Sequence, residues 1–168
     1  MKFSCLISCY YKDSAEQLRE ALNSLALQTL PATEIVFVED GELSQSLYEV
    51  LDRFSDTLPL VRVRIMENKG LGNALYEGLR RCTYEIVIRM DADDICAYNR
   101  FEEQVAFMSS HPEVDIVGSW AKDIDEKGNI IGERKYPTSH EELYKLMWTN
   151  PLIHPAVAFR KTSIERIG

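Results

Sequence analysis

Short apolar runs alternate with segments of helical periodicity through the first two-thirds of the chain, and this alternation restricts the fold more than any other feature. The apolar runs cover residues 3–9, 34–38, 61–66 and 86–88, and amphipathic segments follow each of them. Strands that are joined through helices pair in parallel, and their right-handed crossovers place helices on both faces of the sheet. The sequence therefore predicts an α/β fold with a doubly wound, mostly parallel sheet.

The pattern changes after Pro112. Apolar residues in 114–121 and 130–131 flank a glycine-containing turn at 125–129, which is typical of a hairpin. A helix over about 139–148, a strand over 154–160 and a helix from Thr162 should follow. We expect residues 1–168 to form a single domain with an antiparallel C-terminal portion, truncated at its C-terminus because the last helix has no terminator.

Composition and charge exclude several classes of protein. Lys and Arg number 19 against 27 Asp and Glu, for a net charge of −8, which argues against a nucleic-acid partner. No apolar run approaches the roughly 18 residues of a membrane span. Cys5 and Cys9 share one face of a strand but lie about 13 Å apart, too far for a disulfide or a shared zinc ion. We predict free thiols and a cytoplasmic protein.

Polar residues collect where the predicted strands end. These ends are 8–10, Glu39 and Asp40, 68–70, and 91–94. Ligands of open α/β sheets bind beyond the carboxyl ends of the strands, so up to five carboxylates should meet at one edge. Two such charges 4 Å apart repel by about 4 kcal/mol at an effective dielectric constant near 20. A bound Mg²⁺ or Mn²⁺, which prefers oxygen ligands, would relieve that repulsion.

Asp91 and Asp93 are the leading candidates for this site. In extended backbone, residues two apart project to the same side, about 6.6 Å apart, so both carboxylates can address one metal or one metal-bound diphosphate. Asp94 should point the other way and serve as a turn or cap residue. The alternative is a plain polar loop before a helix, but the position directly after the most hydrophobic strand favours a functional site.

Other residues carry weaker signals, each with a structural alternative. Gly70, Gly72 and Asn73 begin a helix, whose N-terminus attracts anions, although a tight turn explains them equally well. His154 should be a buried, hydrogen-bonded histidine, with a contact to sugar or acceptor as the alternative. We expect Trp120 and Trp148 in the core. The pairs Ser14 with Gln17 and Asn99 with Glu102 have capping-box spacing.

Several segments together resemble family 2 glycosyltransferases, in order and over essentially the whole chain. The resemblance is carried by residues 4–10, 25–29, 34–41, 68–74, 90–94, 101–104 and 150–155. It is closest to the bacterial members that build surface polysaccharides. It implies a GT-A fold and a nucleotide-sugar donor, most often UDP-linked, with transfer that inverts the anomeric carbon.

The resemblance also implies residue roles. Asp93 would be the likeliest direct ligand of Mn²⁺ or Mg²⁺, and Asp91 would lie near the ribose or the metal. The implied nucleotide-binding residues are Ser8, Cys9, Tyr10, Glu39, Asp40, Asn68, Gly70, Gly72, Asn73, Asp91 and Ala92. The family's catalytic base is an acidic residue after the His-Pro strand, so we expect it beyond Gly168 and identify none within the chain.

The sequence thus predicts a metal-assisted glycosyltransferase domain. The implied acceptor is a saccharide or lipid-linked saccharide at the inner face of the cell membrane, which would allow peripheral association with that membrane. A nucleotide-sugar-binding module without turnover and a sugar-1-phosphate nucleotidyltransferase are the alternatives, although the latter should carry a glycine-rich basic loop after its first strand. A dehalogenase-type phosphatase and a receiver would both place acidic residues after the first strand instead.

Overall fold

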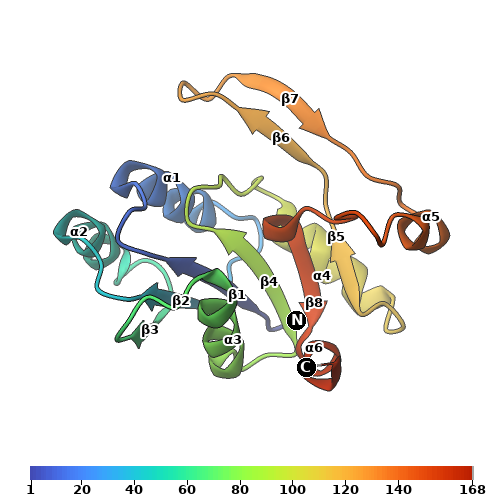
Figure 1. The fold of residues 1–168 in the computed structure, drawn as a ribbon, viewed down its shortest axis with the longest axis horizontal. Helices are drawn as coiled ribbons and strands as arrows, with labels where there is room; N and C mark the ends of the chain where they lie inside the picture. The colour runs from blue at the N-terminus through green and yellow to red at the C-terminus, as the bar shows by residue number, and fades with distance from the viewer. Residues whose placement is uncertain (168) are drawn as a thin grey trace.

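The computed structural model describes residues 1–167 as one sheet with helices on both faces and a hairpin that projects away from it (Figure 1). The strands of the sheet are β1 (Ser4–Cys9), β2 (Glu34–Asp40), β3 (Leu60–Ile65), β4 (Ile86–Asp91), β5 (Ile116–Gly118) and β8 (Val157–Arg160). The helices are α1 (Ala15–Ala26), α2 (Gln45–Phe54), α3 (Leu71–Arg81), α4 (Arg100–Ser110), α5 (His140–Lys145) and α6 (Lys161–Ile167). The hairpin consists of β6 (Ala121–Ile124) and β7 (Ile130–Arg134), and a 3₁₀ turn, η1 (His154–Ala156), precedes β8.

The strand order is β3-β2-β1-β4-β8-β5, with β1 to β4 parallel and β8 antiparallel to both of its neighbours. The chain leaves β1 toward β2 and β3, then returns to the other side of β1 as β4. Such a reversal opens a crevice at the carboxyl ends of the two central strands. Ser8 and Asp91 face each other there in the β1–β4 register. The predicted α/β class and mostly parallel sheet are confirmed.

The sheet is buried on both faces because its central strands are apolar throughout. Helices α1, α2 and α4 cover one face, where Leu22, Phe37 and Phe101 are fully buried. Helix α3 covers the other face and packs very closely, since a Cβ at Gly78 would lie 2.5 Å from Leu6 Cδ1. Only glycine permits that approach, which holds the later turns of α3 close against β1 and β2.

The two predicted capping boxes have different outcomes. Ser14 accepts a hydrogen bond from the backbone N–H of Gln17 at the start of α1, as expected. Asn99 makes no side-chain cap on α4, so that prediction is wrong. The Glu102 carboxylate instead accepts a hydrogen bond from Thr29 Oγ1 at 2.7 Å, which ties α4 to the loop after α1.

The C-terminal part departs further from the sequence-based expectations. The turn at 125–129 does close a hairpin, but the apolar run 114–121 divides between β5 of the main sheet and β6 of the hairpin. Trp120 and Trp148 are 55% and 91% exposed, so their predicted core positions are wrong. Helix α5 spans six residues and buries none of them. The hairpin projects away from the sheet (Figure 1), and Trp120 contacts Lys135 and the Tyr136 carbonyl beside it instead of the core.

The hairpin and α5 leave and rejoin the sheet at the same edge. Strand β5 ends at Gly118 beside the start of β8 at Val157, and the Ser119 N–H donates to the Ala156 carbonyl at 3.0 Å. Residues 119–156 therefore form one excursion that is closed at its base. All four cysteines are buried free thiols, as predicted. Within residues 1–167, no helix has the length and apolarity that crossing a bilayer requires.

Candidate nucleotide-sugar site

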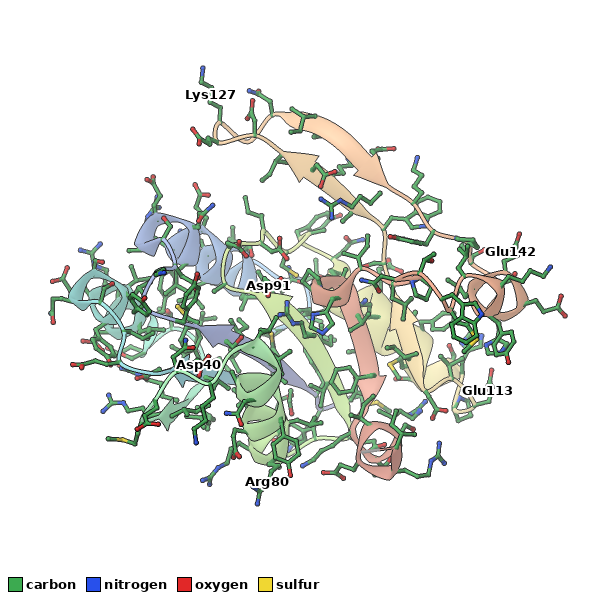
Figure 2. The ribbon with its side chains drawn as sticks, in the orientation of Figure 1. Asp40, Arg80, Asp91, Glu113, Lys127 and Glu142 are labelled. Atoms are coloured by element: carbon green, nitrogen blue, oxygen red, sulfur yellow. The ribbon has the colours of Figure 1, made fainter. Side chains whose placement is uncertain are left out.

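A cavity of about 440 Å³ lies at the carboxyl ends of β1, β2 and β4, beside the start of α3. Its lining residues are Ser8, Cys9, Tyr10, Asp13, Asp40, Asn68, Gly70, Leu71, Asp91, Ala92 and Asp93. The structure thus brings acidic residues from separate strand ends to one hollow. Figure 2 shows Asp91 at the end of β4, with Asp40 nearer β2 and α3. The predicted convergence of Asp40 and Asp93 on one cavity is confirmed.

Most of the predicted nucleotide-binding residues lie on this lining, and three do not. Gly72 and Asn73 belong to the first turn of α3, one and two residues beyond the lining residue Leu71. Glu39 is 1% exposed, and its carboxylate pairs with Arg62 Nε at 2.6 Å and Arg64 Nε at 3.1 Å. Successive residues of a strand face opposite sides, so Glu39 turns away from the cavity that its neighbour Asp40 lines. The geometry gives Glu39 a structural ion pair between β2 and β3.

The Asp40 carboxylate holds the loop that leads into α3. Its Oδ1 accepts the Lys69 N–H and its Oδ2 accepts the Gly70 N–H, both at 3.0 Å. The Asn68 side chain donates to the Asp40 carbonyl at 3.1 Å, so the loop is bound on both sides. Asp40 is 4% exposed, and these charge-assisted bonds compensate its burial. This wall of the cavity is therefore fixed by the protein's own backbone.

Gly41 allows this loop to lie so close. Its φ is +86°, and a Cβ there would meet Asn68 N at 3.0 Å. A side chain would be strained by the backbone conformation and would also press on the loop. Sequence analysis placed Gly41 only within the resemblance to the family. Its role appears once the approach of Asn68 to the end of β2 is known.

The opposite wall, at the end of β4, is charged in a different way. Arg89 Nη1 contacts Asp91 Oδ1 in an ion pair that joins a 2% exposed side chain to a 33% exposed one. Asp93 forms no ion pair or side-chain hydrogen bond with any residue in 1–167. The two acidic residues of this wall therefore differ, because one charge is compensated within the protein and the other is not.

Asp13 and Leu71 line the cavity although sequence analysis did not select them. Asp13 Oδ2 accepts the Tyr10 N–H at 3.0 Å and so closes the turn between β1 and α1. Burial raises the pKa of Asp13, and the negative charges of Asp93 and Asp91 raise it further. The available signal was an acidic residue directly before the Ser14 cap, which folds back toward the end of β1.

Cys9 and His154, the thiol and the histidine considered for this site, show no sign of a reactive role in the described residues. Burial raises the pKa of the Cys9 thiol, and Asp13 adds to the effect, so Cys9 stays protonated. His154 is exposed and lies outside the cavity lining, which makes the prediction of a buried histidine wrong. Partial desolvation lowers the pKa of His154, and the charge of Arg89 lowers it further. A contact of His154 with sugar or acceptor stays a prediction.

Side chains at the cavity suit a divalent cation that is shared with a ligand. No group of three or more His, Cys, Asp or Glu side chains in residues 1–167 is arranged to hold a metal. Mg²⁺ and related ions are commonly held by one or two carboxylates together with substrate phosphates and water. The free carboxylate of Asp93, with Asp91 beside it, supplies such a donor set.

The whole sequence can be compared with models of known protein families. The model for glycosyl transferase family 2 matches residues 4–168, which is nearly the whole chain. The chain belongs to glycosyltransferase family 2.

Two curated relatives of this glycosyltransferase chain come from bacteria. It is 46% identical to the amylovoran biosynthesis glycosyltransferase AmsE of Erwinia amylovora, over 99% of the chain and 62% of that protein. It is 37% identical to the UDP-Gal:α-D-GlcNAc-diphosphoundecaprenol β-1,3-galactosyltransferase of Escherichia coli, over 99% of the chain and 61% of that protein. The chain therefore spans slightly less than two-thirds of the length of these two relatives.

Solved structures confirm the GT-A architecture of this glycosyltransferase domain. The fold matches Staphylococcus aureus TarS 1–349 in complex with UDP, with a TM-score of 0.77 and 23% identity over 99% of the chain and 49% of TarS 1–349. It also matches the mannosyltransferase PcManGT of Pyrobaculum calidifontis in complex with GDP-Man and Mn²⁺, with a TM-score of 0.72 and 22% identity over 99% of the chain and 46% of that protein. At this level of identity the likeness concerns the fold.

Proposed function

We propose that this domain binds a UDP-sugar and supplies the donor half of a glycosyltransferase in polysaccharide biosynthesis. The observation that carries the proposal is the cavity where Asp40, Asp91 and Asp93 converge at the switch point of the sheet. Open α/β sheets bind nucleotides at this position. The E. coli relative is named for a UDP-Gal donor, and the TarS structure contains UDP, which supports uridine as the base.

The two walls of the cavity suit the two ends of such a donor. Beside the wall that Asp40 fixes, Tyr10 is 37% exposed and offers an aromatic face at the mouth of the cavity. We assign this side to the uridine. The wall at the end of β4 offers Asp93, whose charge lacks a protein partner in the described residues. We assign that side to the diphosphate and the sugar.

Asp93, with Asp91 beside it, would hold Mn²⁺ or Mg²⁺ together with the diphosphate. The cation would supply Lewis-acid stabilisation of the charge on the departing diphosphate. The Mn²⁺ in the PcManGT structure supports a metal at this type of site. Asp40 and the backbone of residues 68–70 would hold the nucleotide in place while the sugar faces the acceptor.

The proposed reaction is attack by an acceptor hydroxyl on the anomeric carbon, with a general base taking the proton and the nucleoside diphosphate leaving. Attack from the face opposite the diphosphate inverts the configuration. The acceptor class that we propose is a saccharide or lipid-linked saccharide, because the E. coli relative is named for a diphosphoundecaprenol-linked sugar. A lipid-linked acceptor would bring the protein to the cytoplasmic face of a membrane.

Thermal unfolding with nucleotides tests the donor site. UDP at about 100 times its Kd should add roughly 2.7 kcal/mol of stability in the presence of Mn²⁺. GDP and CDP should add clearly less at the same concentration. Substituting Asp93→Ala should abolish the increment that Mn²⁺ gives to UDP binding. Equal stabilisation in EDTA would remove the metal from the proposal, and no stabilisation by any nucleotide would overturn the donor site itself.

A matched variant separates the site from general charge effects. Glu113 is an acidic surface residue near β5, toward the opposite edge of the sheet from Asp40 (Figure 2). It does not line the cavity. Glu113→Ala removes the same charge as Asp93→Ala and should leave the response to UDP and Mn²⁺ unchanged. A similar loss in both variants would indicate a long-range charge effect in place of a bound cation.

A further inference from the structure

Arg89 is the most unusual side chain in the described part of the molecule. It is 1% exposed and is the largest of the fully buried side chains. It lies on β4 two residues after Val87, and it faces Leu6 in the register between β1 and β4. Alternation along the strand therefore points Arg89 to the same face as Val87, the face that α3 covers. An arginine in that apolar layer requires a compensating group.

In the described residues, the Arg89 guanidinium forms an ion pair with one acidic side chain, that of Asp91. Nε, Nη1 and Nη2 of Arg89 have no hydrogen-bond partner in residues 1–167, and the one ion pair of the guanidinium there is with Asp91 Oδ1. A second guanidinium, that of Arg100, donates to the Arg89 carbonyl at 2.8 Å and adds positive charge nearby. Desolvation of a charge is costly unless it is paired, so the Asp91 carboxylate is held toward the interior.

This pair links the interior of the sheet to the cavity. Asp91 is 33% exposed at its side chain and lines the cavity, while Arg89 lies beneath it. Contact with Arg89 engages Asp91 Oδ1 and leaves Oδ2 as an acceptor. A carboxylate that is already paired with a cation attracts a second cation less strongly, but it still accepts a hydrogen bond from a neutral hydroxyl. Asp93, two residues further along, has no such partner in the described residues.

We propose that Arg89 is a positioning residue that holds Asp91 as the acceptor for a sugar hydroxyl of the nucleotide and leaves cation binding to Asp93. This inference rests on the proposed function, because it needs a nucleotide in the cavity. It goes beyond that function by assigning the placement of Asp91 to a side chain that does not line the cavity. The hydroxyl belongs either to the ribose or to the transferred sugar.

Calorimetric titration with deoxynucleotides tests the division of tasks. The probes are UDP, 2′-deoxy-UDP and 3′-deoxy-UDP, each with Mn²⁺ and with EDTA. We expect the unsubstituted protein to lose about tenfold in affinity for one deoxynucleotide, as befits one hydrogen bond to a charged acceptor. In Arg89→Met this discrimination should fall to less than about twofold. A role confined to stability would weaken all three nucleotides alike and leave their ratio unchanged.

Two further variants keep the test decisive. Arg89→Lys retains a cation of similar reach and should restore part of the discrimination. If circular dichroism shows that Arg89→Met does not fold, Arg89→Lys takes its place in the titrations. Arg80→Met removes an arginine that is 62% exposed at its side chain on α3 and should behave as the unsubstituted protein. Manganese binding, followed by electron paramagnetic resonance, should persist in Arg89→Met and disappear in Asp93→Ala.

The outcomes separate the two proposals. If the unsubstituted protein does not bind UDP, both fail. If it binds UDP and Arg89→Met discriminates the deoxynucleotides equally well, the role of Arg89 fails while the donor site stands. A third outcome is that UDP and both deoxynucleotides bind alike in every variant, while Arg89→Met loses the extra affinity that UDP-galactose has over UDP. The hydroxyl then belongs to the transferred sugar, and the role of Arg89 stands. Loss of manganese binding in Arg89→Met would overturn the division of tasks.

Discussion

The two walls of the cavity carry similar carboxylates but hold them by opposite means. At the end of β2, Asp40 is bound by two backbone N–H groups of the loop into α3, so its charge is compensated by fixed dipoles. At the end of β4, Asp91 is compensated by the buried Arg89, and Asp93 has no protein partner within residues 1–167. One wall is complete without a ligand, whereas the other presents a charge to be neutralised. An acidic cluster can therefore combine carboxylates that the protein itself compensates with one that it leaves uncompensated.

The largest effect should come from breaking the pair on the β4 wall. Asp91→Asn leaves the buried Arg89 guanidinium without a countercharge, which should lower the free energy of unfolding by about 3 kcal/mol. Urea denaturation measures this loss. The double variant Arg89→Met, Asp91→Asn removes both charges and should recover most of the stability. A double variant no more stable than Asp91→Asn would contradict the pairing.

A smaller loss is expected on the β2 wall. Asp40→Ala leaves the N–H groups of Lys69 and Gly70 without their acceptor, at a cost of about 2 kcal/mol. Asp40→Asn keeps one acceptor oxygen and should lose about half as much. Hydrogen exchange at those two amides reports the effect directly, since both should exchange faster in Asp40→Ala. Unchanged exchange rates would show that Asp40 does not hold the loop.

Backbone conformation gives the next effect in size. Gly41→Ala places a Cβ at φ +86° and 3.0 Å from Asn68 N, so we expect a loss of roughly 1 to 2 kcal/mol in unfolding free energy. Gly128 has a φ of +79° with open space around it, so Gly128→Ala isolates the cost of the conformation alone. Gly41→Ala should be the more destabilising of the two in thermal unfolding. Equal losses would mean that the loop yields to the added methyl group.

The smallest change in stability should come from Asp93. Without a protein partner in the described residues, its removal in Asp93→Ala should alter the unfolding free energy by less than about 0.5 kcal/mol in EDTA. The contrast with Asp91→Asn, two residues away, is the sharpest test of the comparison between compensated and free carboxylates. A large loss in EDTA for Asp93→Ala would assign Asp93 a structural task and remove that contrast.

Sequence patterns predicted the parallel sheet and the meeting of its strand ends, because strand pairing and crossover direction follow from the alternation of elements. They did not predict which carboxylates are already compensated. That depends on three-dimensional neighbours, such as the loop N–H groups around Asp40 and the arginines of β3 beside Glu39. Arg89 follows the apolar run 86–88 and drew no prediction, because nothing in its spacing indicates that Asp91 is its partner.

Predictions for the C-terminal part were weaker for a different reason. Apolar residues such as Trp148 suggested a core, since burial is the usual fate of tryptophan in a small domain. Helix α5, which precedes it, buries none of its residues, and Trp148 is 91% exposed, so composition alone misplaced it. Local signals, such as the turn at 125–129, were read correctly because hydrogen bonds within five residues determine them.

The closed base of the 119–156 excursion has an evolutionary consequence. Because the Ser119–Ala156 hydrogen bond closes its base beside the paired ends of β5 and β8, the hairpin and α5 between them can lengthen, shorten or change sequence without shifting any strand of the sheet. Selection acting on that span leaves the donor cavity intact. A lineage can therefore change the surface that this segment presents while inheriting the same cavity beside Asp40 and Asp91.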